Sequence, residues 1–109
     1  MKGRIKRQFV TFQRTRDSMV WEDFLSCHAY INGLSGQEFF IANGGFDSTL
    51  AVEIECRYFP ELMEIIPSAF RAVDSSGVIY ELISPADDIR MEHKTVKFRA
   101  KRVTSDAEL

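Results

Sequence analysis

Residues 54–83 read IECRYFPELMEIIPSAFRAVDSSGVIYELI, and this segment carries the clearest structural signal in the chain. Apolar and polar residues alternate from Ile54 to Tyr58, which is typical of a strand with one buried face. Two more runs rich in β-branched and aromatic residues, 70–74 and 78–84, are separated by Ser75-Ser76-Gly77. A short glycine-containing turn between two such runs predicts a β-hairpin.

Working outward from this segment, the same patterns predict about six strands. Residues 49–58 form the whole of the first strand quoted above, and further strands are expected at 9–14, at 20–31 and around 96–101. The stretch between Pro60 and Pro67 predicts a short helical turn whose apolar residues cover the core. Short strands linked by turns predict an all-β fold, a small antiparallel β-barrel or sandwich.

Two predicted strands have distinct faces. In the strand at 20–31, an apolar face of Leu25, Cys27, Ala29 and Ile31 lies opposite a face of Phe24, Ser26, His28 and Tyr30. The last strand alternates Val96, Phe98 and Ala100 with Lys97, Arg99 and Lys101. We therefore expect the last strand at an edge of the sheet, half-buried and with a cationic outer face.

Residues 34–48 interrupt the strand pattern. Ser35-Gly36-Gln37-Glu38 has the spacing of a capping box, and an aromatic pair follows it directly. We expect a long loop that contains one or two helical turns.

The chain has the size and composition of one globular domain, spanning residues 1–109. It is 45% hydrophobic and 28% charged, which suffices for one compact core. Residues 1–8 are basic and residues 103–109 are polar, and we expect both ends to be flexible. No apolar run approaches the roughly 20 residues of a membrane span, and the basic start lacks the apolar core of a secretion signal, so we expect a cytosolic protein.

Two cysteines and two histidines offer little for catalysis. Cys27 and Cys56 are expected to be buried thiols, although a pair on neighbouring strands remains possible. His28 adjoins Cys27, but consecutive strand residues point to opposite faces and cannot exchange a proton directly. His93 lies beside Glu92 without metal-ligand spacing or a glycine-rich phosphate loop. The sequence therefore predicts no enzyme, no metal and no cofactor.

Charge is strongly segregated along the chain. The net charge is +6 over residues 1–16, −11 over 17–89, +5 over 90–102 and −2 over the last seven residues. Such runs are usually solvated surface. Alternatively, they give one subunit two unlike faces, as head-to-tail association in a ring requires.

The order of certain residues adds a signal that periodicity lacks. The matching positions are Arg14 at the end of a basic strand, Asp17 and Trp21, His28-Ala29, the loop 34–40, Ile54-x-x-Arg57-Tyr58, Phe70-Arg71-x-Val73 and Gly77-x-x-Tyr80-x-Leu82. Over residues 5–102, this order resembles the phage head-tail adaptor family, also called head-tail joining or head-closure proteins. That family's fold is a small antiparallel β-barrel with a long loop toward a central channel.

The resemblance implies a structural component of the virion neck, present in the host cytoplasm before assembly. Such proteins form a ring, which we expect to be dodecameric here, that holds the genome in the packed head. The expected partners are the portal–adaptor complex and a tail or tail-terminator protein. Packaged DNA would pass through the ring, and no membrane would be involved.

By the same resemblance, the loop at 34–48 would face the channel, with Gly36, Gln37, Glu38, Phe39, Phe40 and Asp47 as candidate residues. It contains two carboxylates and no Lys or Arg, so it would repel phosphates instead of binding them. A non-adhesive loop suits a channel through which DNA slides. The alternative is an exposed loop whose charges are incidental.

Candidate contacts to another subunit or to the adaptor are Arg57, Arg71, Lys97, Arg99 and Lys101. Arg57 and Arg71 are the only cations between residues 17 and 89, and a guanidinium pairs directionally with carboxylates. Pairs within the chain, with Glu53, Glu55 or Glu81, are the alternative. Tyr80 and Trp21 are expected at the core or its rim.

A different class of function remains open, namely a nucleic-acid-binding barrel. In that case the basic termini would follow a phosphate backbone, and Phe9, Phe12 and Phe98 would stack on bases.

Overall fold

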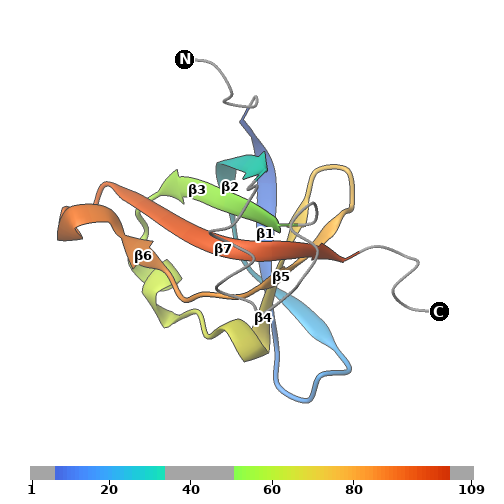
Figure 1. Ribbon diagram of the computed structural model, residues 1–109. Coiled ribbons are helices and arrows are strands. Elements are labelled where there is room, and N and C mark those ends of the chain that lie inside the picture. Colours follow the sequence, from blue (N-terminus) through green and yellow to red (C-terminus); the bar gives the residue numbers. More distant parts are fainter. Residues whose placement is uncertain (1–6, 34–50, 104–109) are drawn as a thin grey trace.

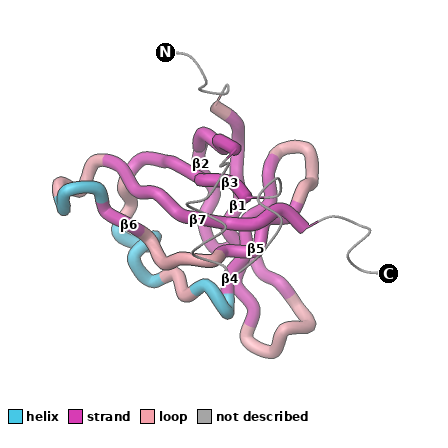
Figure 2. The backbone as a smooth tube through the Cα atoms, viewed as in Figure 1, coloured by secondary structure: helices cyan, strands magenta, loops and turns pink. Residues whose placement is uncertain are grey.

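A computed structural model of the chain describes residues 7–33 and 51–103. Seven strands lie in these two ranges (Figure 1): β1 (Gln8–Thr15), β2 (Trp21–Gly33), β3 (Ala51–Arg57), β4 (Phe70–Asp74), β5 (Ile79–Leu82), β6 (Asp87–Asp88) and β7 (Thr95–Val103). The helical segments of the described ranges are short 3-10 turns at Pro60–Glu64, Pro67–Ala69 and Ile89–Met91 (Figure 2). None of these turns is long and apolar enough to cross a membrane.

Six of the strands close into an antiparallel barrel. The sheet runs in the order β3-β2-β1-β4-β5-β7, and an additional pairing of β3 with β7 joins its two ends. The two residues of β6 pair with Val96 and Lys97, near the start of β7, on the same side of β7 as β5. The structure therefore confirms the all-β prediction and chooses the barrel over the sandwich.

The prediction that the last strand lies at an edge was wrong. β7 pairs with β3 from Thr95 to Lys101 on one side, and with β5 and β6 on the other. An alternating sequence shows which face of a strand is buried. It does not show whether the strand pairs with a neighbouring strand on one side or on both, because alternation concerns side chains and not backbone hydrogen bonds. The unpaired donors of an edge strand are absent here because closure supplies the second partner.

The barrel interior is filled by apolar strand faces, and those of β3 and β7 were predicted from the alternation. Phe12 from β1 and Phe98 from β7 are fully buried, and their ring centroids lie 5.2 Å apart. Burying one such side chain contributes roughly 1.5–3 kcal/mol. The remaining members of the core cluster are Val10, Cys27, Ala29, Ile31, Ile54, Cys56, Leu62, Ile65, Phe70, Ala72, Tyr80, Leu82, Val96 and Ala100.

A β-bulge in β2 disturbs the predicted alternation. Phe12 lies opposite Leu25 and Gln13 lies opposite Asp23, so Phe24 is the extra residue on β2. Both Phe24 and Leu25 are half-buried, and the Phe24 ring meets Phe70 edge to face at 5.0 Å. Placing Phe24 on the face opposite Leu25 was therefore incorrect, because a bulge shifts the face of the residues beyond it.

The segment between Pro60 and Pro67 covers one end of the core, as predicted. Within this segment, the side chains of Leu62 and Ile65 are buried. Met63 and Ile66 point outward and remain exposed. The prolines hold the chain in tight turns here because their φ angle suits the first position of a helical turn.

Asp74 organises the tight turn between β4 and β5. Its Oδ1 accepts hydrogen bonds from the backbone N–H groups of Ser76 (2.8 Å) and Val78 (3.0 Å), and its Oδ2 accepts from the Tyr80 hydroxyl (2.9 Å). Gly77 takes the left-handed conformation with φ 89°, which glycine adopts without steric cost. The predicted hairpin at this site is confirmed.

Strands extend slightly beyond the expected bounds at both ends. β1 begins at Gln8 and β7 ends at Val103. The predicted loop at 34–48 lies outside the described residues.

Candidate assembly surfaces

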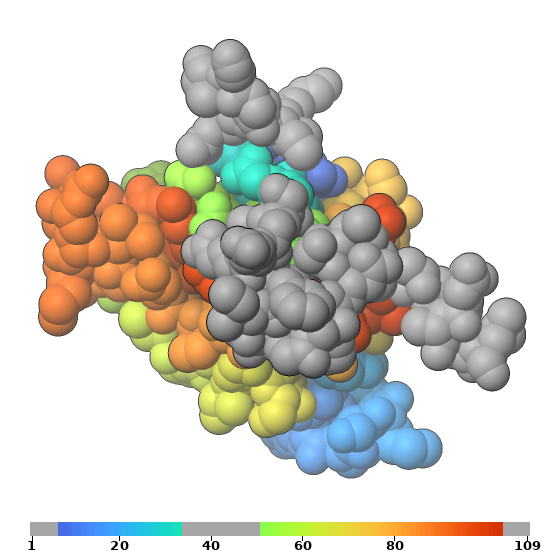
Figure 3. Space-filling view, in the orientation of Figure 1, coloured from blue at the N-terminus to red at the C-terminus, as the bar shows by residue number. Residues whose placement is uncertain are grey.

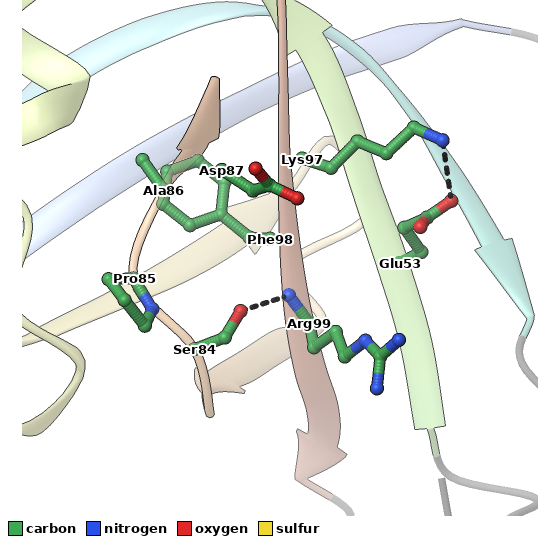
Figure 4. Close-up of a pocket in the computed structure, with 8 residues that line it drawn as sticks. All are labelled: Glu53, Ser84, Pro85, Ala86, Asp87, Lys97, Phe98 and Arg99. Atoms are coloured by element: carbon green, nitrogen blue, oxygen red, sulfur yellow. Dashed lines mark hydrogen bonds and ion pairs between the residues drawn. The ribbon is translucent and has the colours of Figure 1, made fainter. Parts of the chain in front are cut away.

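Two cations of the last strand line a surface pocket on the outside of the barrel (Figure 4). Its volume is about 500 Å³, and it is bounded by Glu53, Ser84, Pro85, Ala86, Asp87, Lys97, Phe98 and Arg99. Two of the cations, Lys97 and Arg99, are among these residues, and Lys101 follows on the same face of β7. In Figure 4 the Ser84 hydroxyl lies at the Arg99 backbone, whose N–H donates to Oγ at 2.9 Å.

Carboxylates lie opposite these cations across the strand pairs. Glu53 faces Arg99, and its Oε1 lies 3.9 Å from the Lys97 Nζ atom. Asp87 lies opposite Lys97, and Glu81 lies opposite Lys101. The cationic outer face of β7 therefore lies between carboxylates of its neighbouring strands, because the fold places the acidic middle of the chain beside its basic end.

Arg71 is held by neighbours from β1 and β2. Its Nε donates to the Gln13 side-chain oxygen at 2.8 Å, and Gln13 in turn donates to Asp23 at 3.0 Å. The guanidinium carbon lies 4.3 Å from the centre of the Trp21 ring, a cation–π geometry. Partial burial lowers the pKa of Arg71, which nonetheless remains protonated at any physiological pH.

Beside Arg71 and Trp21 runs a groove of about 520 Å³ with a largely apolar lining. Its walls come from β2, β4, β5, the end of β7 and the 3-10 turn at Pro67–Ala69. The lining residues are Trp21, Pro67, Ser68, Phe70, Arg71, Ile79, Glu81, Leu82, Ile83 and Val103. Concave apolar surfaces with a few charged groups are typical of binding sites.

Arg57 has a different environment from Arg71. It is exposed at the end of β3, and its guanidinium carbon lies 6.0 Å from the centre of the Phe59 ring. Of the two arginines in the acidic middle, Arg57 is therefore the more accessible to another protein. The positions of both as assembly contacts remain predictions.

The loop between β6 and β7 carries an unusual concentration of left-handed backbone. Arg90, Met91 and His93 have φ angles of 56°, 56° and 59°, and none of them is glycine. Each such residue costs of order 1–3 kcal/mol and persists only where its surroundings impose it. At the loop's tip, Met91 is 82% exposed.

Asp88 and Tyr58 hold this loop in place. Asp88 accepts a hydrogen bond from the His93 backbone N–H at 2.9 Å, and its second oxygen pairs with His93 Nδ1. The His93 ring stacks on the Tyr58 ring with 4.5 Å between centroids. Sequence reading missed this arrangement, and the only available signal was a lone Met within the charged run at 90–94.

The two cysteines are buried, free and close together. Cys27 and Cys56 lie on the paired strands β2 and β3, with Ala29 opposite Cys56. Their thiols share a hydrogen bond that raises the pKa of Cys56 and lowers the pKa of Cys27. His28 points outward and meets Phe9 edge to face at 5.4 Å, which confirms that Cys27 and His28 face opposite ways.

The aromatic residues proposed to stack on bases are mostly inaccessible. Phe12 and Phe98 are core residues, and only Phe9 of the three is exposed, at 48%. The structure thus contradicts two of the three stacking residues expected for a nucleic-acid-binding barrel. Tyr80 and Trp21 lie at the core and its rim as predicted.

The six channel-facing candidates, Gly36, Gln37, Glu38, Phe39, Phe40 and Asp47, lie outside the described residues. In the ranges 7–33 and 51–103, no group of three or more His, Cys, Asp or Glu side chains is arranged to hold a metal ion.

Comparison with known proteins supplies a family. The sequence model of the phage head completion protein family matches residues 5–103. The fold is similar to the solution structure of a protein from Shigella flexneri 2a, with a TM-score of 0.64, 22% sequence identity, and 95% of this chain and 97% of that chain covered. No curated protein matches the sequence.

Proposed function

This chain belongs to the phage head completion protein family, and from that premise we propose that it forms a ring in the head–tail connector, closing the DNA-filled head and joining it to the tail. The family match across residues 5–103 is the observation that carries the proposal. It covers every strand of the barrel, so the whole fold and not one motif supports it. A structural role in head closure follows from the family, and the ring is our extension of it.

The proposed partners are the portal–adaptor complex above and a tail or tail-terminator protein below. A small closed barrel suits such a position because closure leaves its long strands without free edges that could pair with wrong chains. Contacts with other proteins must then come from side chains and loops and not from backbone pairing of the long strands. We propose Arg57 and the outer face of β7, with Lys97, Arg99 and Lys101, as part of these contacts.

The loop at 34–48 is proposed to face the channel. Its two carboxylates would keep the lining from binding phosphates. Changing Glu38 and Asp47 together to Lys should slow genome exit from the virion, since added cations would hold the DNA backbone. Unchanged ejection kinetics would remove the channel-facing role.

The head-closure role is tested with phage heads that were packaged in the absence of this protein. Added purified protein should bind the heads, protect their DNA from DNase and restore tail joining. Electron microscopy of the reconstituted necks should show a ring of this protein. Heads that already retain their DNA and accept tails without it would refute the role.

A single substitution probes the proposed surface. Arg57→Glu should weaken binding to the heads by roughly tenfold, since charge reversal places a carboxylate against its expected acidic partner. Arg102→Glu, at an exposed position on β7, is the matched control. Equal binding by both variants would remove Arg57 from the contact.

A further inference from the structure

The loop between β6 and β7 and the apolar groove beside Trp21 are two unlike surfaces of one chain. In Figure 1 the loop projects at the left of the barrel, whereas the start of β2 and the end of β7, which line the groove, lie at the right. The space-filling view (Figure 3) likewise shows the residues around 90 protruding at the left. A head-to-tail ring needs two different, complementary surfaces placed apart on each subunit.

We propose that Met91 of one subunit inserts into the groove of a second copy of this chain. The inference rests on the proposed ring and names the contact that would build it. Met91 is the most exposed large apolar side chain among the described residues. Its flexible thioether side chain adapts well to an irregular apolar surface such as that formed by Trp21, Ile79 and Val103.

The backbone of the loop supports a binding role. Three non-glycine residues of the loop have left-handed conformations, and one of them, His93, is held by Asp88 and Tyr58. Strain of this kind concentrates at functional sites, where it fixes a side chain before binding. A fixed loop loses less conformational freedom on association than a mobile one.

Charges on the two surfaces are complementary. Arg90 and Glu92 flank Met91 and form an exposed pair with 3.8 Å between Nη1 and Oε1. Glu81 and Arg71 line the groove. With Met91 seated, Arg90 would meet Glu81 and Glu92 would meet Arg71, so both pairs have opposite signs.

The contact is small, which favours assembly on a template. One loop in one groove buries less than the roughly 1,200–2,000 Å² of a stable interface. The ring therefore forms on the portal–adaptor complex, where neighbouring subunits are held close together. The decisive test accordingly uses assembled particles.

The first test is disulfide cross-linking in phage particles that carry the full-length variant Met91→Cys/Ile79→Cys. Mild oxidation should give a ladder of covalent multimers of this protein, which a reducing agent collapses. Met91→Cys/Ser76→Cys, with its second cysteine on the exposed β4–β5 turn, should give no ladder. Wild-type protein, in which both native thiols are buried, gives the background level of cross-linking.

Two outcomes overturn the contact. One is a particle that contains the protein in a ring but gives no ladder from the Met91→Cys/Ile79→Cys variant. The other is a cross-link from position 91 to a different virion protein only. Either result leaves the head-closure proposal intact, whereas particles whose necks lack this protein would refute that proposal itself.

Charge reversal provides a second test that does not depend on cysteine geometry. Arg90→Glu and Glu81→Arg should each lower the number of copies incorporated per particle by roughly tenfold, as loss of a central contact does. Combined in one chain, the two changes should restore incorporation, because the pair formed by residues 90 and 81 regains opposite signs. Both residues are exposed, so we expect each variant to fold. Thermal unfolding checks this. Failure of the double variant to recover would contradict the proposed pairing.

Discussion

Two turns of this molecule are each organised by an aspartate that accepts backbone hydrogen bonds, but they differ in backbone strain. In the β4–β5 turn, Asp74 accepts two backbone N–H groups and one hydroxyl, and Gly77 takes the left-handed position. In the β6–β7 loop, Asp88 likewise accepts a backbone hydrogen bond, from His93, but the residues with left-handed conformations are Arg90, Met91 and His93. The first turn joins β4 to β5 at little conformational cost. The second retains strain and presents an exposed Met91, which is what a binding loop requires.

The largest expected effect comes from removing the carboxylate of the first turn. Asp74→Ala should lower the free energy of unfolding by roughly 3 kcal/mol, since three donors lose their acceptor and the Tyr80 hydroxyl is left buried. Urea unfolding monitored by fluorescence measures it. Asp87→Ala, at an exposed position on β6, should change stability by less than about 0.5 kcal/mol. Equal effects of the two changes would contradict the role of Asp74.

Removing the carboxylate of the second turn should cost less. Asp88→Ala should destabilise the protein by about 1–2 kcal/mol, because Asp88 holds one backbone N–H and one exposed imidazole. Its main consequence should be local release of the loop. Trypsin should then cleave after Arg90 faster than in the wild type, at a concentration that leaves the barrel intact. An unchanged cleavage rate would show that Asp88 does not fix the loop.

Alkaline pH tests the third contact of Asp74. Burial, followed by the bond to Asp74, raises the pKa of Tyr80 to about 12, whereas an unfolded tyrosine ionises near 10. The unfolded state therefore releases this proton first, and stability should fall as pH rises from about 10 to 12. Urea unfolding across this range should show a slope for the wild type that Tyr80→Phe lacks. Identical slopes would contradict the burial of this hydroxyl.

The glycine of the first turn should be worth about 1 kcal/mol. Gly77→Ala forces a Cβ atom into φ 89°, although no other atom lies within 4 Å of it, so the cost is purely conformational. Thermal unfolding of this variant beside Ser75→Ala, an exposed neighbour in the same turn, measures it. A neutral Gly77→Ala would mean that the turn relaxes to another conformation.

The smallest effect has the opposite sign. Met91→Gly should stabilise the isolated protein by about 0.5 kcal/mol, since glycine accepts φ 56° and Met91 contributes almost no burial. Stability and assembly should therefore change in opposite directions in this variant. Met91→Leu, which keeps both the strain and an apolar tip, is the control. A destabilised Met91→Gly protein would argue that the loop carries no strain.

The local elements were largely readable from the sequence. The hairpin at Ser75-Ser76-Gly77, the cover at Leu62 and Ile65, and the buried faces of β3 and β7 follow from alternation and turn chemistry. The bulge at Phe24 was not readable, because nothing in its neighbourhood marks an extra residue. Of the candidate assembly residues, Arg71 is tied to Trp21 and Gln13 through contacts between distant strands that no local pattern reports.

The amino-acid sequence by itself determined which residues face the core, where the chain turns and which family it belongs to, because period-two alternation, proline, glycine and residue order are local properties. Only the tertiary structure decided that β7 meets β3 and closes the barrel, since this strand pairing depends on contacts between residues 38 to 50 positions apart. The same closure converted a segregated charge pattern into cross-strand pairs of opposite sign. It also placed a strained Met91 loop and an apolar groove far apart on one small barrel, and that separation is the basis for the proposed contact between copies.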